Sequence, residues 1–186
     1  LRSIGLGKGD AIGLFMPMTP EIVIALLAIA KIGGVILPLF SGYGEAAIAS
    51  RLIDAEAKAL FTADGFYRRG QVVRMKDTAD AACAQVPTLK HVIVVKRTGE
   101  DVSMFAARDK WWHELIEPQP DHAPTERTSA EDPLLILYTS GTTGKPKGVV
   151  HTTGGYMVGT WLTTKYVFDL HENDTYFCTA DVGWIT

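Results

Sequence analysis

The stretch AIGLFMPMTPEIVIALLAIAKIGGVILPL, residues 11 to 39, predicts the fold of this chain. It opens and closes with short apolar runs, at 11 to 16 and 35 to 39, which are typical of buried strands. Between the two runs, Thr19 and Pro20 mark the start of a helix, as the N-cap and the first helical residue. The order strand, helix, strand indicates a parallel pair of strands, and we expect the helix to be buried because it is apolar on nearly all sides.

Part of this stretch also resembles a membrane span. Residues 22 to 40 are almost wholly apolar and nearly long enough to cross a bilayer. However, Lys31 lies at their centre, Gly33 and Gly34 end the helical part, and Pro38 follows soon after. The run therefore divides into a helix and a short strand, and we expect no membrane partner.

The same alternation of apolar runs and helical patterns continues along the chain. The patterns predict helices near 45 to 56, 69 to 85 and 154 to 166, and strands at 59 to 63, 91 to 95, 134 to 138, 148 to 152 and 175 to 180. Strands that are apolar on both sides and alternate with helices belong to parallel sheets. The predicted class is α/β, with a mainly parallel sheet and flanking helices.

A polar stretch interrupts the alternation at residues 117 to 133, EPQPDHAPTERTSAEDP. Its four prolines and its many charges indicate an exposed linker. We expect this linker to divide one domain into a first α/β lobe, residues 1 to 116, and a second lobe, residues 134 to 186.

The composition of the chain excludes several classes of partner and site. The formal net charge of −3 and the scattered lysines and arginines give no electrostatic footprint for nucleic acid, so small molecules are the expected partners. The two cysteines, Cys83 and Cys178, lack the spacing of a zinc site or a disulfide framework, and no protein-held metal is predicted.

The two ends of the chain carry no recognisable signals. The first residue is Leu1, no basic segment precedes an apolar one, and the last residues, DVGWIT, lack turn chemistry. We expect a cytoplasmic protein whose natural chain continues beyond these residues.

The segment YTSGTTGKPKG, from Tyr138 to Gly148, is the candidate functional motif. Its glycines allow close backbone approach to a ligand, its hydroxyls can donate hydrogen bonds, and its lysines carry charge, which together suit a polyphosphate. The bland alternative is a glycine-rich hairpin with solvated lysines. The predicted phosphate-binding residues are Thr139, Ser140, Gly141, Thr142, Thr143, Gly144, Lys145 and Lys147.

Two other phosphate-binding motifs do not fit. A P-loop of the phosphotransferase kind needs Ser or Thr after its lysine and a helix directly afterwards, whereas Pro146 follows Lys145 and an apolar strand pattern comes next. GLGKGD, residues 5 to 10, lacks the spacing of a dinucleotide-binding turn and precedes the first strand. A helix after Lys145 would restore the P-loop alternative.

YTSGTTGKPKG resembles the signature phosphate loop of the adenylate-forming superfamily. The segments HTTGGY at 151 to 156, KYVFDL at 165 to 170 and FCTADVGWIT at 177 to 186 resemble the AMP-forming acetyl-CoA synthetases within it, as do GKGDAIGLFMPMTPE, RLIDAEAK and RDKWWHELIE earlier in the chain. The resemblance covers essentially the whole chain. It implies that the chain is part of the large N-terminal domain of such an enzyme.

The resemblance also implies a reaction in two steps with ATP, Mg²⁺ and CoA. A carboxylate, acetate in this family, attacks the α-phosphate of ATP, and CoA then displaces AMP from the acyl-adenylate. Thr139 and Lys147 would be catalytic, because the loop stabilises charge on the phosphates as pyrophosphate leaves.

Two further pairs of residues take roles from the resemblance. Trp184 and Thr186 would lie at the acyl pocket, although a packed aromatic is the commoner role for a tryptophan between apolar neighbours. Gly42 and Arg68 would bind CoA, although a solvated helix start explains Arg68 equally well. The segment FSGYG at 40 to 44 departs from the family's FGGFS.

A second departure concerns the basic residues for CoA. The family often has a second arginine where this chain has Gln71, and Arg69 is an additional neighbour. Which arginine meets the phosphate of CoA therefore stays open between Arg68 and Arg69.

The family's adenine-binding and ribose-binding segments, its hinge acid and its adenylation lysine match no part of the sequence. We therefore expect the 186 residues alone to be inactive. Two alternatives stay open at this point: a synthetase for propionate or another short acid, and a non-catalytic nucleotide-binding protein that keeps only the loop.

Overall fold

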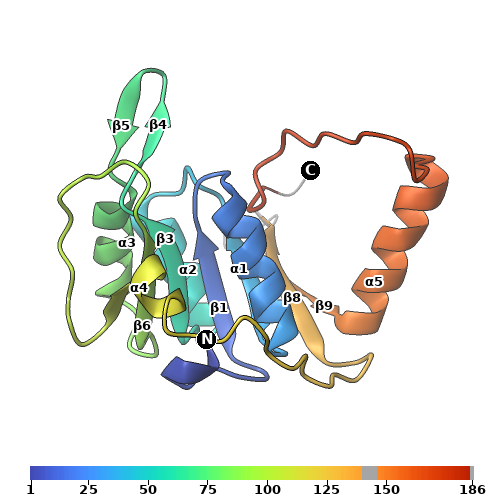
Figure 1. Cartoon of the computed structure of the whole chain (residues 1–186), viewed down its shortest axis with the longest axis horizontal. Helices are drawn as coiled ribbons and strands as arrows, with labels where there is room; N and C mark the ends of the chain where they lie inside the picture. Colours follow the sequence, from blue (N-terminus) through green and yellow to red (C-terminus); the bar gives the residue numbers. More distant parts are fainter. Residues whose placement is uncertain (140–145, 185–186) are drawn as a thin grey trace.

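The computed structural model describes residues 1–139 and 146–184. Within them, a seven-stranded sheet in the order β7-β6-β3-β1-β2-β8-β9 forms the centre of the molecule (Figure 1). Neighbouring strands run parallel except β8 and β9, which form an antiparallel pair at one edge. The strands are β1 (Ala11–Phe15), β2 (Val35–Leu39), β3 (Ala59–Ala63), β6 (His91–Val95), β7 (Asp109–Trp111), β8 (Pro133–Thr139) and β9 (Lys147–Thr152).

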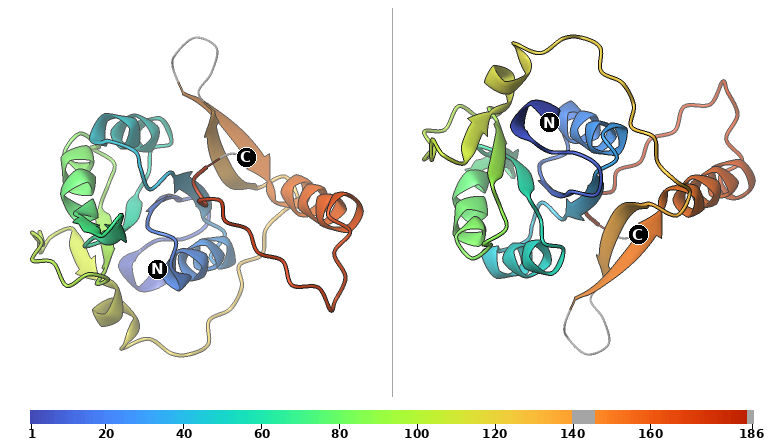
Figure 2. Two further views of the ribbon diagram at one scale, coloured as in Figure 1. Left: turned by 90° about the horizontal axis from the view of Figure 1, so that it is seen from above. Right: turned by 90° about the horizontal axis from the view of Figure 1, so that it is seen from below.

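Helices cover both faces of this sheet. Figure 2 shows α1 (Pro20–Lys31) and α4 (Trp112–Ile116) on one face, and α2 (Glu45–Asp54) and α3 (Met75–Cys83) on the other. A short 3₁₀ turn, Arg2–Ile4, precedes β1. The α/β class with a mainly parallel sheet and flanking helices is therefore confirmed.

The unit predicted from residues 11 to 39 is present as β1, α1 and β2. All residues of β1 and of β2 are buried, as expected for strands with helices on both sides. The two strands pair in parallel from Ala11↔Val35 to Phe15↔Leu39. Because every parallel strand ends at the same edge, the loops that follow β1, β2, β3, β6 and β8 gather at the carboxyl edge of the sheet.

The expectation that α1 is buried on all sides was wrong. Ile22, Ala25 and Ile29 are buried, but Leu27 is 60% exposed and Val23 is 52% exposed. One side of α1 packs on the sheet, and its outer side has no covering element in the described part of the chain (Figure 2).

The start of α1 agrees with the predicted N-cap only in its position. Thr19 is the extended N-cap residue and Pro20 begins the helix, but the Thr19 hydroxyl makes no capping hydrogen bond. Its Oγ1 is buried without a hydrogen-bond partner among the described residues.

The helix predicted near 69 to 85 is present only in its second part. A two-stranded hairpin, β4 (Phe66–Arg68) and β5 (Gln71–Val73), comes first, and α3 begins only at Met75. The hairpin forms because both turn residues adopt positive φ, 50° at Arg69 and 76° at Gly70, the backbone of a tight two-residue turn. Arg68 therefore lies on a strand, not at the start of a helix. The hairpin projects from the carboxyl edge of the sheet (Figure 1).

The last third of the chain agrees with the prediction in part. α5 (Thr153–Leu162) and a π-helical turn, Thr163–Val167, confirm the helix expected near 154 to 166. Residues 175 to 180 form no strand, which corrects the prediction, because β9 has no further strand beside it within the described residues. α5 stands apart from the sheet in Figure 1.

The polar stretch after α4 is exposed, as its composition predicts. It follows the surface beside α1, where Lys31 Nζ donates to Thr125 Oγ1 over 2.8 Å and Arg2 Nη1 donates to the Pro124 carbonyl over 2.7 Å. β8 then joins the sheet beside β2. The division into two lobes stays a prediction.

Among the residues that the structure describes, no helix has the length and apolar character needed to cross a bilayer. The cytoplasmic location also stays a prediction.

Candidate active site

The β8–β9 hairpin carries the root of the predicted phosphate loop. β8 ends at Thr139 and β9 begins at Lys147, close to the limits of Tyr138 and Gly148 that the sequence predicts. Thr139 and Lys147 are directly opposite in the antiparallel ladder, so their side chains project to the same face. Both residues are exposed. A hydroxyl and an ammonium therefore flank the loop on one side.

The rest of the predicted phosphate loop lies outside the described residues, together with its expected irregular form and mobility. These residues are Ser140, Gly141, Thr142, Thr143, Gly144 and Lys145. Pro146 is described and is not helical, and the strand β9 follows it. This strand excludes the P-loop alternative, which requires a helix directly after Lys145.

Tyr138, the residue before Thr139, attaches the end of β8 to the helix α2. The residue is buried, and its hydroxyl donates a hydrogen bond to Asp54 Oδ2 at the end of α2. Burial, followed by the contact with Asp54, raises the pKa of the Tyr138 phenol above its ordinary value. Tyr138 therefore stays a neutral hydrogen-bond donor. Its bond to Asp54 lets α2 fix the position of the last residues of β8.

The loop after β2 carries the predicted CoA residue Gly42. This loop is compact, because the Phe40 ring packs edge-on against the Tyr43 ring with centroids 5.6 Å apart. A Cβ atom built on Gly42 would lie 2.6 Å from the Phe40 ring. A side chain at position 42 would therefore have to displace the Phe40 ring.

The segment with the predicted acyl residue Trp184 packs on the same loop. The Trp184 ring meets the Phe40 ring edge-on with centroids 5.0 Å apart. A Cβ atom on Gly183 would overlap the backbone of Leu39 and Phe40, so only glycine permits this contact. The residue predicted at the acyl pocket and the residue predicted to bind CoA thus contact one aromatic ring from two parts of the chain. Thr186 lies outside the described residues.

Trp184 is half-exposed and also borders a hollow of about 480 Å³. Apolar side chains of α1, β8 and α5 form most of its wall, and Pro38 and Val182 contribute next to Trp184. Packing on Phe40 and lining a hollow are both compatible with a tryptophan at an acyl pocket, so that role stays a prediction.

A hydrogen bond also joins the loop after β2 to the segment that carries Trp184. Ser41 Oγ donates to Asp181 Oδ2 over 2.6 Å, and Gly183 N–H donates to Asp181 Oδ1 over 2.8 Å. Asp181 thus forms the turn that carries Trp184 and ties it to the end of β2. This turn contradicts the expectation that DVGWIT lacks turn chemistry, and the contact with Ser41 was also missed. The departure of FSGYG from the family's FGGFS was the available signal.

The β4–β5 hairpin presents the predicted CoA residue Arg68. Arg68 is exposed and stands directly opposite Gln71 in the hairpin ladder. Gln71 occupies the position where the family often has its second arginine. Two guanidinium groups at these positions would therefore project to one face and could share one phosphate.

Asp64 fixes the root of this hairpin, a role that the sequence did not reveal. Its buried carboxylate accepts the backbone N–H groups of Gly65, Arg97, Thr98 and Gly99 over 2.7 to 3.0 Å. Burial alone would raise the pKa of Asp64, but the four N–H donors together hold it below its ordinary value. The loop after β6 is thereby bound to the residues that directly precede the hairpin.

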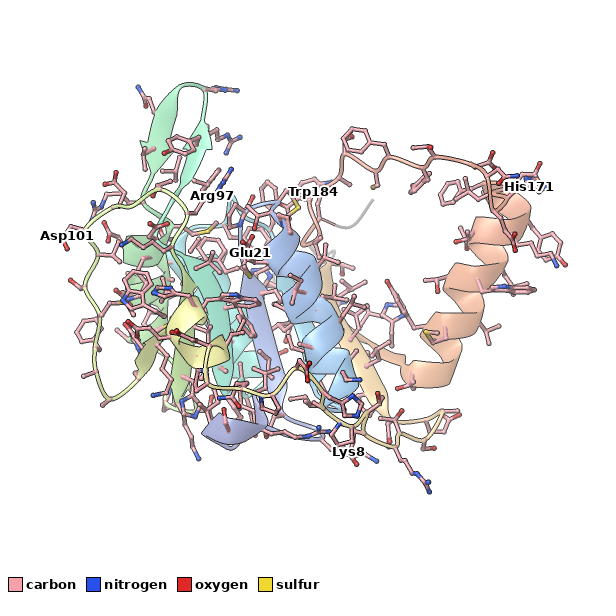
Figure 3. All side chains as sticks on the ribbon, in the orientation of Figure 1. Lys8, Glu21, Arg97, Asp101, His171 and Trp184 are labelled. Carbon is pink, nitrogen blue, oxygen red and sulfur yellow. The ribbon has the colours of Figure 1, made fainter. Side chains whose placement is uncertain are left out.

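Those predicted functional residues that the structure describes thus share the carboxyl edge of the sheet. Figure 3 shows Trp184 and Arg97 at this edge and Lys8 at the opposite one. In open α/β sheets, ligands bind at the carboxyl ends of the strands. No group of three or more His, Cys, Asp or Glu side chains in residues 1–139 and 146–184 could hold a metal ion.

A mainly parallel α/β sheet with its strand-end loops gathered at the carboxyl edge is typical of proteins that bind nucleotides and other small ligands there. The family model described as "AMP-binding enzyme" matches residues 1–186, and the chain belongs to this family.

The curated relatives agree with this assignment. Over its whole length, the chain is 50% identical to the acetyl-coenzyme A synthetase of Methanothrix thermoacetophila and 48% identical to that of Escherichia coli. It spans 28% and 29% of the length of these two relatives.

A solved structure shares the fold. The acetoacetyl-CoA synthetase from Streptomyces lividans superposes with a TM-score of 0.89 at 31% identity. The match covers 99% of this chain and 28% of that one.

Proposed function

We propose that the protein containing this chain is an acetate–CoA ligase of the AMP-forming type. One acetate oxygen attacks the α-phosphorus of ATP, the bond to the β-phosphate breaks, and acetyl-AMP and pyrophosphate form. The CoA sulfur then attacks the acetyl carbonyl carbon, and the bond to AMP breaks. The observation that carries the proposal is the shared contact of Gly42 and Trp184 with Phe40, next to the strand that ends at Thr139.

In the first step, the β8–β9 hairpin would hold the polyphosphate. Lys147 places a positive charge beside the loop, and Thr139 offers a hydroxyl donor on the same face. Both would stabilise the negative charge that pyrophosphate gains as it leaves, which is where a positioned donor contributes most to the rate. The six loop residues from Ser140 to Lys145 would supply the remaining donors.

Mg²⁺ belongs to the proposal as an ion held mainly by the phosphates. The Thr139 hydroxyl is a hard oxygen donor, and Mg²⁺ is commonly bound through one or two protein oxygens plus substrate phosphates. When bound, the ion would neutralise part of the phosphate charge. Thr139 and Lys147 would orient the same phosphates from the protein side.

In the second step, the loop after β2 and the β4–β5 hairpin would hold CoA. Gly42, which has no side chain, would let the thiol arm of CoA pass close to the backbone, and Arg68 would pair with a phosphate of its nucleotide. Trp184 would border the acyl group. Acetate is the proposed acid because the relatives named acetyl-coenzyme A synthetase are 48–51% identical, whereas the acetoacetyl-CoA synthetase is 31% identical.

Pyrophosphate exchange into ATP tests the proposal. The assay uses labelled pyrophosphate with acetate, propionate, butyrate and acetoacetate in parallel, followed by thioester formation with CoA. Exchange that is fastest with acetate supports the proposal. Exchange that prefers propionate or acetoacetate would change the acid, and ATP binding without exchange under any carboxylate would replace the ligase with a nucleotide sensor.

A further inference from the structure

Arg51 is a buried cation that none of the roles above uses. It lies on α2, and the whole residue is only 7% exposed. Its Nη1 donates to the Ala47 carbonyl over 2.7 Å, while its Nε is buried without a hydrogen-bond partner among the described residues. Because burial of a guanidinium is costly unless the group is paired or hydrogen-bonded, Arg51 needs further stabilisation to remain buried.

Two tyrosine rings supply that stabilisation. The Arg51 guanidinium carbon lies 4.4 Å from the centroid of the Tyr43 ring and 5.7 Å from that of the Tyr138 ring. Both distances fall within the reach of cation–π attraction, which strengthens when the cation is removed from water. One buried charge therefore attracts two rings at once.

The two rings belong to different parts of the candidate site. Tyr43 follows Gly42 in the loop predicted to bind CoA, and Tyr138 precedes Thr139 at the root of the phosphate loop. Tyr138 is also hydrogen-bonded to Asp54, one turn beyond Arg51 on the same helix. The loop after β2 and the end of β8 are thus attached to a single helix at adjacent points.

We propose that Arg51 is a positioning residue that holds the loop after β2, at Tyr43, and the root of the phosphate loop, at Tyr138, in one fixed relation. The proposal rests on the proposed ligase function, in which the acyl-adenylate made beside one loop must meet the thiol held by the other. Displacement of either loop would move its tyrosine away from the shared cation. Arg51 therefore favours the arrangement in which both subsites are aligned.

Kinetics of Arg51→Met test the proposal in the protein that contains this chain. Methionine fills similar space without charge or planar stacking. We expect pyrophosphate exchange to fall about ten-fold and the KM for CoA to rise about ten-fold, the size of effect that a desolvated cation–π contact can supply. Arg51→Lys keeps the charge but loses the planar group, so it should restore each parameter in part.

Arg108→Met is the matched control. The Arg108 guanidinium also lies over an aromatic ring, 4.8 Å from Phe105, and its side chain is mostly buried, but it belongs to an ion cluster around Lys76. Removing it should lower the thermal midpoint and leave the KM for CoA unchanged. Tyr43→Leu should raise the KM for CoA, and its effect should be smaller when Arg51 is already Met.

The proposal is overturned if Arg51→Met or Arg51→Lys only lowers the thermal midpoint, as Arg108→Met does, with both kinetic parameters at their wild-type values. If Arg51→Met does not fold, Arg51→Lys decides the question alone, and an approximately three-fold change in both parameters is expected. An unmodified protein without pyrophosphate exchange would instead reject the ligase function on which the proposal rests.

Discussion

The Ser41 hydroxyl donates a 2.6 Å hydrogen bond to Asp181 Oδ2, although the two residues are 140 positions apart in the chain. The Ser41 backbone N–H donates to the same oxygen over 3.3 Å. Through this pair, the end of β2 holds the turn that places Trp184 on Phe40. The family segment that resembles FSGYG has glycine at the position of Ser41, so the side-chain bond is a feature of this chain.

Removal of the Ser41 hydroxyl should destabilise the protein and loosen Trp184. We expect Ser41→Ala to lower the free energy of unfolding by about 1.5 to 3 kcal/mol, as for other hydrogen bonds to charged groups. Denaturant unfolding and the quenching of tryptophan fluorescence measure the two effects. Ser41→Thr retains a hydroxyl and should recover most of the stability. Equal stability of Ser41→Ala and wild type would show that the bond contributes nothing.

Loss of the charge at Lys147 should impair the first step. We expect Lys147→Ala to slow pyrophosphate exchange by about 10² to 10³, equivalent to roughly 3 to 4 kcal/mol for a positioned donor at developing charge. Lys90→Ala, an exposed lysine just before β6, is the control and should exchange at the wild-type rate. Unchanged exchange in Lys147→Ala would remove the catalytic role from this residue.

The hairpin geometry predicts a gain of function at position 71. Because Gln71 stands opposite Arg68, Gln71→Arg should place two guanidinium groups on one phosphate and lower the KM for CoA about three- to ten-fold. Arg68→Ala should raise the same constant. Gln85→Arg adds an equal charge to an exposed position after α3 and should leave the KM unchanged. The prediction fails if both added arginines act alike, since that would indicate a general charge effect.

Gly44 offers a site for stabilisation. It is the N-cap of α2 in extended conformation, without a capping side chain, and a Cβ atom there would meet nothing within 4 Å. Gly44→Ser should supply a hydroxyl to the first turn and raise the free energy of unfolding by a few tenths of a kcal/mol. Gly7→Ser is the control, because Gly7 is another uncrowded glycine. It measures how much the replacement of glycine changes stability through the entropy of the unfolded chain alone. A difference of zero between the two variants would contradict a capping contribution.

Asp64 should make the fold sensitive to acid. Its pKa is lower in the folded state than in the unfolded state, so its contribution to stability is complete above the unfolded pKa and disappears as the pH falls through the folded pKa. Between about pH 6 and about pH 3, wild type should therefore lose more stability than Asp64→Asn. Asp121→Asn, at an exposed carboxyl in the linker, should follow wild type. Parallel pH curves for wild type and Asp64→Asn would contradict the assignment.

Local patterns predicted most elements of the fold correctly. The apolar runs of β1, β2, β3 and β6 are buried strands, because burial on both faces leaves a nearly unbroken hydrophobic sequence. The run in β8 also forms a strand, but only Leu135 and Tyr138 are buried in it. The limits of the phosphate loop were also predicted to within one residue, because the apolar runs of β8 and β9 mark its two sides.

The errors arose where a neighbour decides the structure. Residues 69 to 73, the turn and second strand of the hairpin, were read as helix because the turn depends on positive φ at Arg69, which composition does not reveal. Residues 175 to 180 have strand-like composition but no strand to pair with among the described residues. The outer side of α1 is exposed for a similar reason, since burial depends on what packs against the helix.

By itself, the sequence determined the α/β class, the parallel order of β1 and β2, and the resemblance that assigns roles to Thr139, Lys147 and Trp184. These follow from periodicity and motif, which are properties of neighbouring residues. Only the tertiary structure decided that Ser41 meets Asp181 and that Arg51 lies between Tyr43 and Tyr138. Hydrogen bonds and cation–π contacts act over a few ångströms, so residues far apart in the chain can form them only after the sheet has brought its loops to one edge.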